Sequence, residues 1–259
     1  MNIIRKYGCL KDRREKLEHI YRPTFQAAVT FPDAFDLGAV PNAAFGLLDQ
    51  GSLGSCTGFG CKRAAWYGLR KAGQVVEPSA LFQYYNERLD DGDVDQDNGS
   101  TISEGIAALQ KYGICPEADW PYDPAKFAVC PPLTPCYNDA LQFKALTAER
   151  INNDGNLAQN IMDALFNQRI PIVFGTDVFQ QFESEAAAQT GLIDLPAAGA
   201  TPLGGHCMLI RGWDNNAPGG PRCRISNSWG QWGDNGDAWI LFDYLAQYAS
   251  DFWAIPVME

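Results

Sequence analysis

The stretch Asp49-Gln-Gly-Ser-Leu-Gly-Ser-Cys56 delivers a thiol to the start of a predicted helix. From Thr57 to Ala72 the apolar side chains lie largely on one broad face, and Gly73 is a natural C-terminal stop. Unpaired backbone N–H groups and the helix dipole favour the thiolate at such a position, and the thiolate is the nucleophilic form of cysteine. A single cysteine here is equally compatible with a small buried hydrophobe, so its meaning depends on partners elsewhere in the chain.

Two later stretches supply such partners. Gly204-Gly-His206 begins a predicted strand, and Ser226-Asn-Ser-Trp-Gly230 ends another strand that can pair back on the first as a hairpin. That pairing would place the amide of Asn227 beside His206, where it can fix the ring tautomer and leave the other ring nitrogen facing the thiol. Trp229 would shield this hydrogen bond from water. The chain has two histidines, and the other, His19, lies in a charged stretch that we expect to be helical and solvated.

Helices are predicted first along the chain and strands afterwards, which indicates an α+β protein with two lobes divided near residues 131–135. Ser79 is a plausible N-cap, and Thr101 with Glu104 forms a capping box. Besides the helix over residues 57–72, one helix is predicted to start at Ser79 and another at Thr101. A further helix is predicted over residues 157–167. The predicted strands cover residues 170–176, 206–213, 223–226, 238–242 and 252–257.

The composition is that of an ordered globular protein, with 46% apolar and 20% charged residues in a chain of 259. The net charge of −11 makes nucleic acid an unexpected partner. No signal peptide or run of about 18 apolar residues is present, so we expect no membrane partner and a location in the cytoplasm or export by another route. Residues 1–22 nevertheless carry seven basic against three acidic side chains. This basic arm is either a solvated tail or lies against the acidic body.

The eight cysteines include no C-x-x-C pair, and we expect no zinc site. Cys130 and Cys136 flank a proline-rich loop, where they are either bridged locally or free thiols.

The ordered motifs resemble the papain family of cysteine peptidases, and within it the bacterial xylellain-like branch with a short leader. The resemblance runs from about Phe31 to Val257. It rests on the stretch that ends at Cys56, on Gly-Gly-His206, on Asn-Ser-Trp-Gly230 with the following Trp232-Gly233 and Gly236, and on Asp251-Phe-Trp. It implies a papain-like two-lobe α+β fold, with a helical lobe over about 45–130, a β-barrel-like lobe over about 131–259 and the active site in the cleft between them. Residues 1–30 would then be a basic arm or short pro-segment preceding the peptidase domain, residues 31–259.

The resemblance also implies roles. Cys56 would be the nucleophile, His206 the general base and acid, and Asn227 the orienting residue. Gln50 would donate to the oxyanion beside the backbone N–H of Cys56. These parts predict a cysteine endopeptidase that works through a thioester on protein or peptide substrates, with no metal or organic cofactor. A papain-fold acyl transferase or isopeptidase and a non-catalytic binding homologue are the alternatives.

The substrate site follows from the same resemblance. Gly99 and Ser100 would pair with the substrate backbone, and Trp229 would also belong to the substrate site. A specificity pocket would prefer an apolar side chain two residues before the scissile bond. The predicted pocket residues are Ile102, Val173 and Cys207, with Gly205 at the edge.

Three positions depart from the family pattern. Leu53 and Asp97 stand where the family usually has a disulfide, and Thr57 replaces the usual aromatic residue after the nucleophile. The missing bridge suits a reducing compartment or a lineage that never relied on it. Because only about thirty residues precede Phe31, we expect the arm either to cover the cleft or to brace the two lobes.

Overall fold

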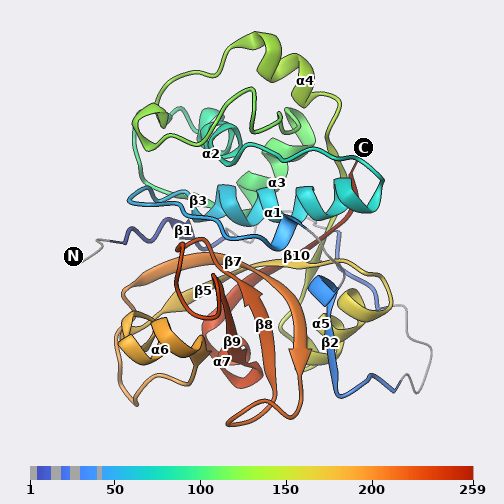
Figure 1. The fold of residues 1–259 in the computed structure, drawn as a ribbon, viewed down its shortest axis with the longest axis vertical. Coiled ribbons are helices and arrows are strands. Elements are labelled where there is room, and N and C mark those ends of the chain that lie inside the picture. Colours follow the sequence, from blue (N-terminus) through green and yellow to red (C-terminus); the bar gives the residue numbers. More distant parts are fainter. Residues whose placement is uncertain (1–4, 13–18, 24–29, 40–42, 259) are drawn as a thin grey trace.

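The structure is a computed structural model that describes residues 5–12, 19–23, 30–39 and 43–258. The helices are α1 (Cys56–Lys71), α2 (Ala80–Leu89), α3 (Ile102–Lys111), α4 (Asn138–Ala140), α5 (Leu157–Phe166), α6 (Glu185–Thr190) and α7 (Phe242–Tyr248). Helices α1 to α4 gather in one half of the molecule, and the large sheet with α5, α6 and α7 forms the other (Figure 1).

The sheet follows the order β4-β10-β5-β7-β8-β9-β6, with β2 paired to β7 outside this path. The strand β5 begins with three buried apolar residues, Ile172 to Phe174, as expected for a segment that is covered on both faces. The strands are β2 (Ala34–Asp36), β4 (Ala145–Ile151), β5 (Ile172–Val178), β6 (Leu192–Ile193), β7 (Gly204–Asp214), β8 (Arg222–Ser226), β9 (Asp237–Leu241) and β10 (Ala249–Met258).

Helix α1 packs directly against the sheet, and the close approach depends on Gly60. A Cβ on Gly60 would lie 2.6 Å from Sγ of Cys207 on β7 and 3.2 Å from Cγ1 of Val173 on β5. Any larger residue would therefore push the helix away from the strands. This contact sets the distance between Cys56, at the start of α1, and the strand that carries His206.

A second, small sheet lies between the two halves. It pairs β1 (Cys9–Leu10), from the basic arm, in parallel with β3 (Ser100–Thr101), just before α3. Figure 1 shows β1 between α1 and β3 on one side and β7 on the other. The described part of the arm, residues 5–12, therefore lies between the helices and the large sheet.

Most predicted elements are confirmed, with boundaries shifted by a few residues. Ser79 caps α2 by accepting from the N–H of Phe82 at 3.1 Å, and the capping box of α3 is formed by Thr101 and Glu104. The helices-then-strands prediction is also confirmed, and the sheet contains all five predicted strands.

Other predictions differ from the structure, or concern residues that the structure describes only in part. Strand β4 was not predicted, because charged side chains interrupt its apolar alternation. His19 is exposed as expected, but residues 19–23 form no helix, since Ile20 makes a β-bridge to Arg150. Residues 13–18 of that stretch lie outside the described residues. Cys130 and Cys136 are both free thiols, so the local bridge is absent.

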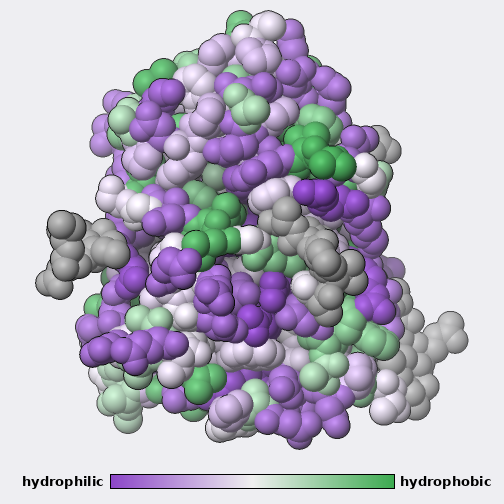
Figure 2. Space-filling model, viewed as in Figure 1, coloured by the Kyte–Doolittle hydropathy of each residue, from purple (hydrophilic) through white to green (hydrophobic). Residues whose placement is uncertain are grey.

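The molecular surface in Figure 2 is mostly hydrophilic, and its hydrophobic residues form small separate groups. Within the described ranges, no helix combines the length and the apolar character needed to cross a bilayer.

Candidate active site

Cys56 begins α1 and is completely buried. The preceding Ser55 does not cap the helix with its side chain, because its hydroxyl bonds with that of Tyr122 at 2.7 Å. The N-terminal end of α1, with its partial positive charge, is therefore next to the thiol. This is the local environment that the sequence predicts for a nucleophilic cysteine.

His206 and Asn227 meet as the predicted hairpin of β7 and β8 requires. Nε2 of His206 lies 2.7 Å from Oδ1 of Asn227, and this oxygen also accepts from the N–H of Ser228 at 2.7 Å. The amide orientation is therefore held by the backbone. Trp229 stacks on the imidazole with ring centroids 4.7 Å apart and excludes water from the hydrogen bond. Nδ1 of His206 has no hydrogen-bond partner among the described residues.

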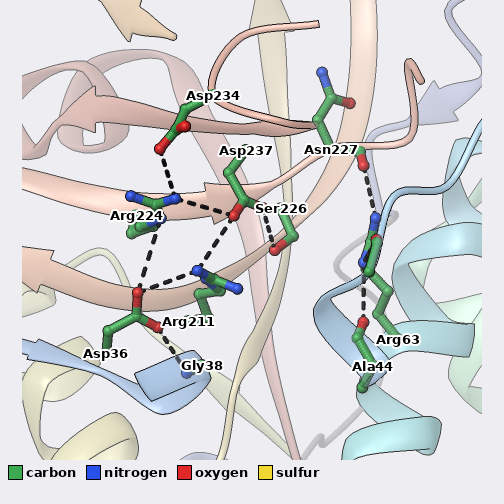
Figure 3. A network of polar contacts seen from close by, with 11 residues as sticks. Asp36, Gly38, Ala44, Arg63, Arg211, Arg224, Ser226, Asn227, Asp234 and Asp237 are labelled. Carbon is green, nitrogen blue, oxygen red and sulfur yellow. Dashed lines mark hydrogen bonds and ion pairs between the residues drawn. The ribbon is translucent and has the colours of Figure 1, made fainter. Parts of the chain in front are cut away.

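The backbone of Asn227 is hydrogen-bonded to Arg63 of helix α1, which begins at Cys56, a feature that sequence reasoning missed. Arg63 lies two turns after Cys56 on α1, and its Nη2 donates to the carbonyl oxygen of Asn227 at 2.8 Å. Its Nη1 donates to the carbonyl oxygen of Ala44 at 2.9 Å (Figure 3) and to that of Gly46 at 3.0 Å. One buried guanidinium thus fixes the position of Asn227 relative to the helix of Cys56.

An ion-pair network holds β8 on the other side of Asn227. Ser226 donates to Asp237 at 2.8 Å, and Asp237 pairs with Arg211 at 3.2 Å and with Arg224 at 3.3 Å (Figure 3). Buried charges need such partners, because desolvation without them is costly. The network keeps the end of β8 rigid where it delivers Asn227.

Gln50 is buried and lies next to Ser228, the residue after Asn227. Its Oε1 accepts from the Ser228 hydroxyl at 2.6 Å, and its backbone N–H donates to the Ser228 carbonyl at 2.9 Å. Nε2 donates one hydrogen to the Leu53 carbonyl at 2.8 Å, which leaves the second hydrogen for another acceptor. The side chain is therefore held in a single orientation.

Burial keeps the thiol and the imidazole uncharged in this structure. It lowers the pKa of His206 to about 4, against the hydrogen bond that Nε2 makes to Oδ1 of Asn227, and the nearby Arg5 lowers it further. Burial also raises the pKa of Cys56 well above its ordinary value, as does the nearby Cys9. The backbone N–H groups of Cys207 and Gly8 act in the opposite direction on the thiol.

The predicted pocket residues are brought together. Ile102 starts α3, while Val173 and Cys207 lie on the adjacent strands β5 and β7, and all three are buried. Gly205 is half-buried at the start of β7. On the other side of the cleft, the N–H of Gly99 donates to the hydroxyl of Tyr84 at 3.3 Å.

The arm occupies this space. The N–H of Ser100 donates to the carbonyl oxygen of Gly8 at 2.8 Å, so the backbone position predicted to pair with substrate is already bonded to the arm. The ring of Tyr7 meets Trp229 edge-on, with centroids 6.3 Å apart, and that of His206 at 6.5 Å. Gly8 also passes close to the segment before Cys56, because a Cβ on Gly8 would lie 1.8 Å from the carbonyl oxygen of Gly54.

Ion pairs link the arm to the acidic body. Arg5 bonds with Glu183 at 2.6 Å, Lys6 with Asp97 at 2.5 Å, and Lys11 with Asp177 at 3.0 Å. Arg5 also lies over the ring of Trp229, with its guanidinium carbon 4.2 Å from the centroid. The described part of the arm is therefore not a solvated tail.

Asp12 anchors the other end of the described arm segment. Its Oδ1 accepts from the N–H and the hydroxyl of Ser103, at the start of α3, at 3.1 and 2.8 Å. Its Oδ2 accepts from Nε1 of Trp253 at 3.1 Å, and its N–H donates to Asp251 at 3.1 Å. Asp12 thus connects both halves of the molecule.

Asp97 holds together the region where the family usually has its disulfide. The Asp97 carboxylate accepts from the N–H of Gly54 at 3.1 Å and from the hydroxyl of Tyr84 at 2.5 Å, besides pairing with Lys6. Burial raises its pKa, but these hydrogen bonds outweigh burial and leave the pKa below its ordinary value. Hydrogen bonds to the Asp97 carboxylate therefore connect the chain segments at Gly54 and Asp97 that the family's disulfide would connect.

Thr57, the other departure, donates to a buried carboxylate. Its hydroxyl bonds with Glu87 on α2 at 2.6 Å, and Nε2 of Gln83 bonds with the same residue at 3.1 Å. Burial raises the pKa of Glu87 to about 8, although both hydrogen bonds oppose the shift. Sequence reasoning missed Glu87, because it sits in an ordinary helical charge pattern.

Comparisons with known proteins agree with this geometry. The sequence profile of the papain family cysteine protease matches residues 31–246. An uncharacterized peptidase C1-like protein of Acanthamoeba polyphaga mimivirus is 33% identical, over 98% of this chain and 87% of that protein.

Solved structures are also similar. Xylellain, a cysteine protease from Xylella fastidiosa, is 32% identical with a TM-score of 0.84, over 98% of this chain and 96% of that one. Procathepsin B S9 of Trypanosoma congolense is 17% identical with a TM-score of 0.76, over 98% of this chain and 86% of that one, and shows the fold alone. The predicted two-lobe fold and the xylellain-like branch are confirmed. The chain is a member of the papain family of cysteine proteases.

Proposed function

We propose that the protein is a cysteine endopeptidase whose catalytic residues are Cys56, His206, Asn227 and Gln50. The observation that carries this assignment is the hydrogen bond between His206 and Asn227, which leaves Nδ1 of His206 without a partner among the described residues. A base oriented by a third group and placed near a thiol is the arrangement that nucleophilic catalysis requires.

In the proposed mechanism, Nδ1 of His206 takes the proton of Cys56, and the thiolate attacks the carbonyl carbon of the substrate. The free hydrogen of the Gln50 amide and the N–H of Cys56 stabilise the oxyanion. The imidazolium then gives its proton to the leaving amine, which leaves a thioester. His206 finally deprotonates a water molecule that releases the acid.

Endopeptidase action is supported by the path of the arm. Residues 5–12 form a continuous segment that passes the thiol, from Glu183 at one end to Ser103 at the other. A substrate chain that extends in both directions from its scissile bond fits such a path. The pocket of Ile102, Val173 and Cys207 carries no charge, and we propose that it prefers a small apolar side chain two residues before that bond.

The first experiment compares wild type with Cys56→Ala on a peptide library, with labelling by an epoxide-type thiol inhibitor. We expect cleavage after apolar–X pairs and a single label in wild type, and neither in the variant. An unlabelled Cys56 in a chain without the arm would favour a non-catalytic homologue. Transfer to amine acceptors without hydrolysis would favour the acyl transferase.

We also propose that residues 1–30 form a latency arm and that residues 31–259 form the peptidase domain. The contacts of Tyr7 and Gly8 with the site support occlusion over a simple brace. A chain that starts at Phe31 should cleave peptides faster than the full chain. A chain that lacks only residues 1–12 keeps the hydrogen bond between Tyr21 and Asp163 and serves as a second variant. Equal rates in all three chains would contradict occlusion.

A further inference from the structure

Four cysteines gather where the arm crosses the cleft. Cys9 lies in the arm, Cys56 and Cys61 on α1, and Cys207 on β7, and all four are free and buried. A Cβ on Gly60 of α1 would lie 2.6 Å from Sγ of Cys207, and ionisation of Cys9 or Cys56 would raise the pKa of both Cys61 and Cys207, which agrees with a close spacing of the four side chains. The proposed mechanism uses only Cys56.

Within this group, Cys9 and Cys207 form a pair. Cys9 lies against the start of β7, since a Cβ on Gly205 would lie 3.8 Å from Cβ of Cys9, and the Cys207 thiol faces α1, since a Cβ on Gly60 would lie 2.6 Å from its Sγ. The backbone agrees, because a Cβ on Gly175 would lie 3.1 Å from Sγ of Cys9, and Gly175 is the cross-strand partner of Cys207 in the β5–β7 pairing. Opposite Cβ atoms in an antiparallel pair are about 5 Å apart, so the Cys9 thiol lies over the strand position next to Cys207.

The other two thiols are directed elsewhere. A Cβ on Gly105 of α3 would lie 2.7 Å from Sγ of Cys61, which places this thiol at the interface of α1 and α3. The Cys56 thiol lies at the start of α1, where the backbone N–H groups of Gly8 and Cys207 lower its pKa. Cys9 therefore has Cys207 as its geometrically matched partner.

We propose that Cys9 and Cys207 form a reversible disulfide that fastens the arm in the cleft under oxidising conditions. A low-molecular-weight disulfide such as oxidised glutathione is the oxidant. One protein thiolate attacks it and releases one reduced glutathione, and the second protein thiolate then displaces the other glutathione. The two cysteines lose two hydrogens, and one oxidised glutathione becomes two reduced molecules.

Exchange takes place while the arm is transiently lifted, because both thiols are buried when it is docked. The disulfide then closes the specificity pocket with its own sulfur atoms, since Cys207 is a wall of that pocket. Reduction frees the arm without any cleavage of the chain. This regulatory role depends on the latency arm proposed above, whereas the formation of the bond does not.

The test maps the bond in the full-length Cys56→Ala chain, which has no nucleophile and cannot process itself. The chain is treated with oxidised glutathione, blocked with an alkylating agent, and digested with trypsin without reduction. Trypsin separates the relevant cysteines, because residues 7–11 hold only Cys9 and residues 170–211 hold only Cys207. We expect these two fragments to be linked, and the link to disappear after dithiothreitol. An alkylated or glutathionylated Cys9 after full oxidation would overturn the proposal.

Matched variants establish the partner. In the Cys56→Ala background, Cys207→Ser and Cys9→Ser should abolish the linked fragment, and Cys61→Ser should retain it. In the wild-type chain, a link from Cys9 to the fragment that ends at Lys62 would assign the bond to Cys56 or Cys61, which share that fragment, and would also overturn the proposal. Melting curves of the variants show whether each is folded.

Amide hydrogen exchange measures how much the disulfide stabilises the docked arm. Oxidation of the Cys56→Ala chain should slow exchange over β1 and β3 by about thirtyfold, since a disulfide stabilises the closed form it bridges. The Cys9→Ser variant should show no change on oxidation. A linked fragment with unchanged exchange in the parent chain would show a bond that does not fasten the arm, and would overturn the regulatory part of the proposal.

Discussion

Gly8 of the arm passes Gly54 so closely that a Cβ on Gly8 would lie 1.8 Å from the carbonyl oxygen of Gly54. Gly54 is two residues before the nucleophile, and its backbone is held by Asp97. Only a residue without a side chain can pass the thiol at this point. The fit of the arm in the cleft therefore depends on one methyl-sized space.

The Gly8→Ala variant should release the arm and raise peptidase activity. Overpacking of this kind costs about 2 kcal/mol, or a factor of about 30 in the docking equilibrium. The rate of cleavage of a fluorogenic dipeptide with apolar side chains measures the effect. Leu10→Ala is the matched control, because Leu10 is in the same strand but is 49% exposed. Equal activation by both variants would argue against a specific steric fit.

Replacement of Gln50 by Glu should lower kcat by about 10² to 10³, the usual loss when an oxyanion donor is removed. The variant keeps an oxygen for the Ser228 hydroxyl but removes the Nε2 donor. Ser228→Ala keeps the donor and removes only the bond that orients it, so its loss should be smaller. Both are measured in a chain that lacks the arm, and unchanged kcat in Gln50→Glu would exclude Gln50 from the oxyanion site.

Arg63→Met should lower kcat more than it raises KM, because it frees the backbone of Asn227 without touching substrate. Arg63→Lys should recover part of the activity through one remaining hydrogen bond. The pH–rate profile is the decisive measurement, since a misplaced Asn227 shifts the apparent pKa of His206. A profile unchanged in both variants would limit Arg63 to a purely structural role.

Glu87→Gln should stabilise the protein at alkaline pH. Because the folded state raises the pKa of Glu87 to about 8, the native state binds more protons than the unfolded state between about pH 4.5 and 8. Stability from this group therefore falls as pH rises through that range. The variant should melt about 5 to 10 °C higher than wild type at pH 9 and nearly equally at pH 4.5. The exposed Glu185→Gln serves as the control.

Acid should release the arm. With the arm docked, burial and the nearby Arg5 hold the pKa of His206 at about 4, and we expect removal of the arm to return it toward the ordinary value of about 6.5. The docked state thus binds fewer protons between these values, and docking weakens as pH falls through them, by up to about 100-fold.

Amide exchange over β1 in Cys56→Ala follows this release. A His206→Gln variant should lose the effect between pH 6.5 and 4. It should retain the weakening at lower pH that protonation of Asp97 causes, because the pKa of that carboxyl is lowered. Release with the same pH dependence in both chains would assign it to the carboxylates.

The sequence was sufficient to predict contacts that depend on neighbours along the chain or across one hairpin. Asn227 and His206 were placed together because two strands joined by a short connection pair in only a few registers. Strand β4 escaped prediction because its apolar alternation is broken by Glu149 and Arg150. Its place depends on pairing with β10, about a hundred residues later in the chain.

The position of the arm could not be derived from its sequence. Its charge was compatible with a solvated tail, and only the fold brings Glu183, Asp97 and Asp177 to the positions of Arg5, Lys6 and Lys11. The pair of Cys9 and Cys207 depends on the same long-range geometry. Sequence separation hides such contacts, whereas the catalytic motifs carry their own local signals.

The carboxylate of Asp97 has a further consequence for how the molecule responds to its surroundings. Since Asp97 joins by hydrogen bonds what relatives join by a covalent bridge, and the described cysteines are all free, a reducing agent has no bond in this region to break. Oxidation or reduction of the cysteines therefore leaves the hydrogen bonds that hold this region of the fold unchanged. A change in redox conditions can act on the arm and the nucleophile while the framework that positions them stays the same.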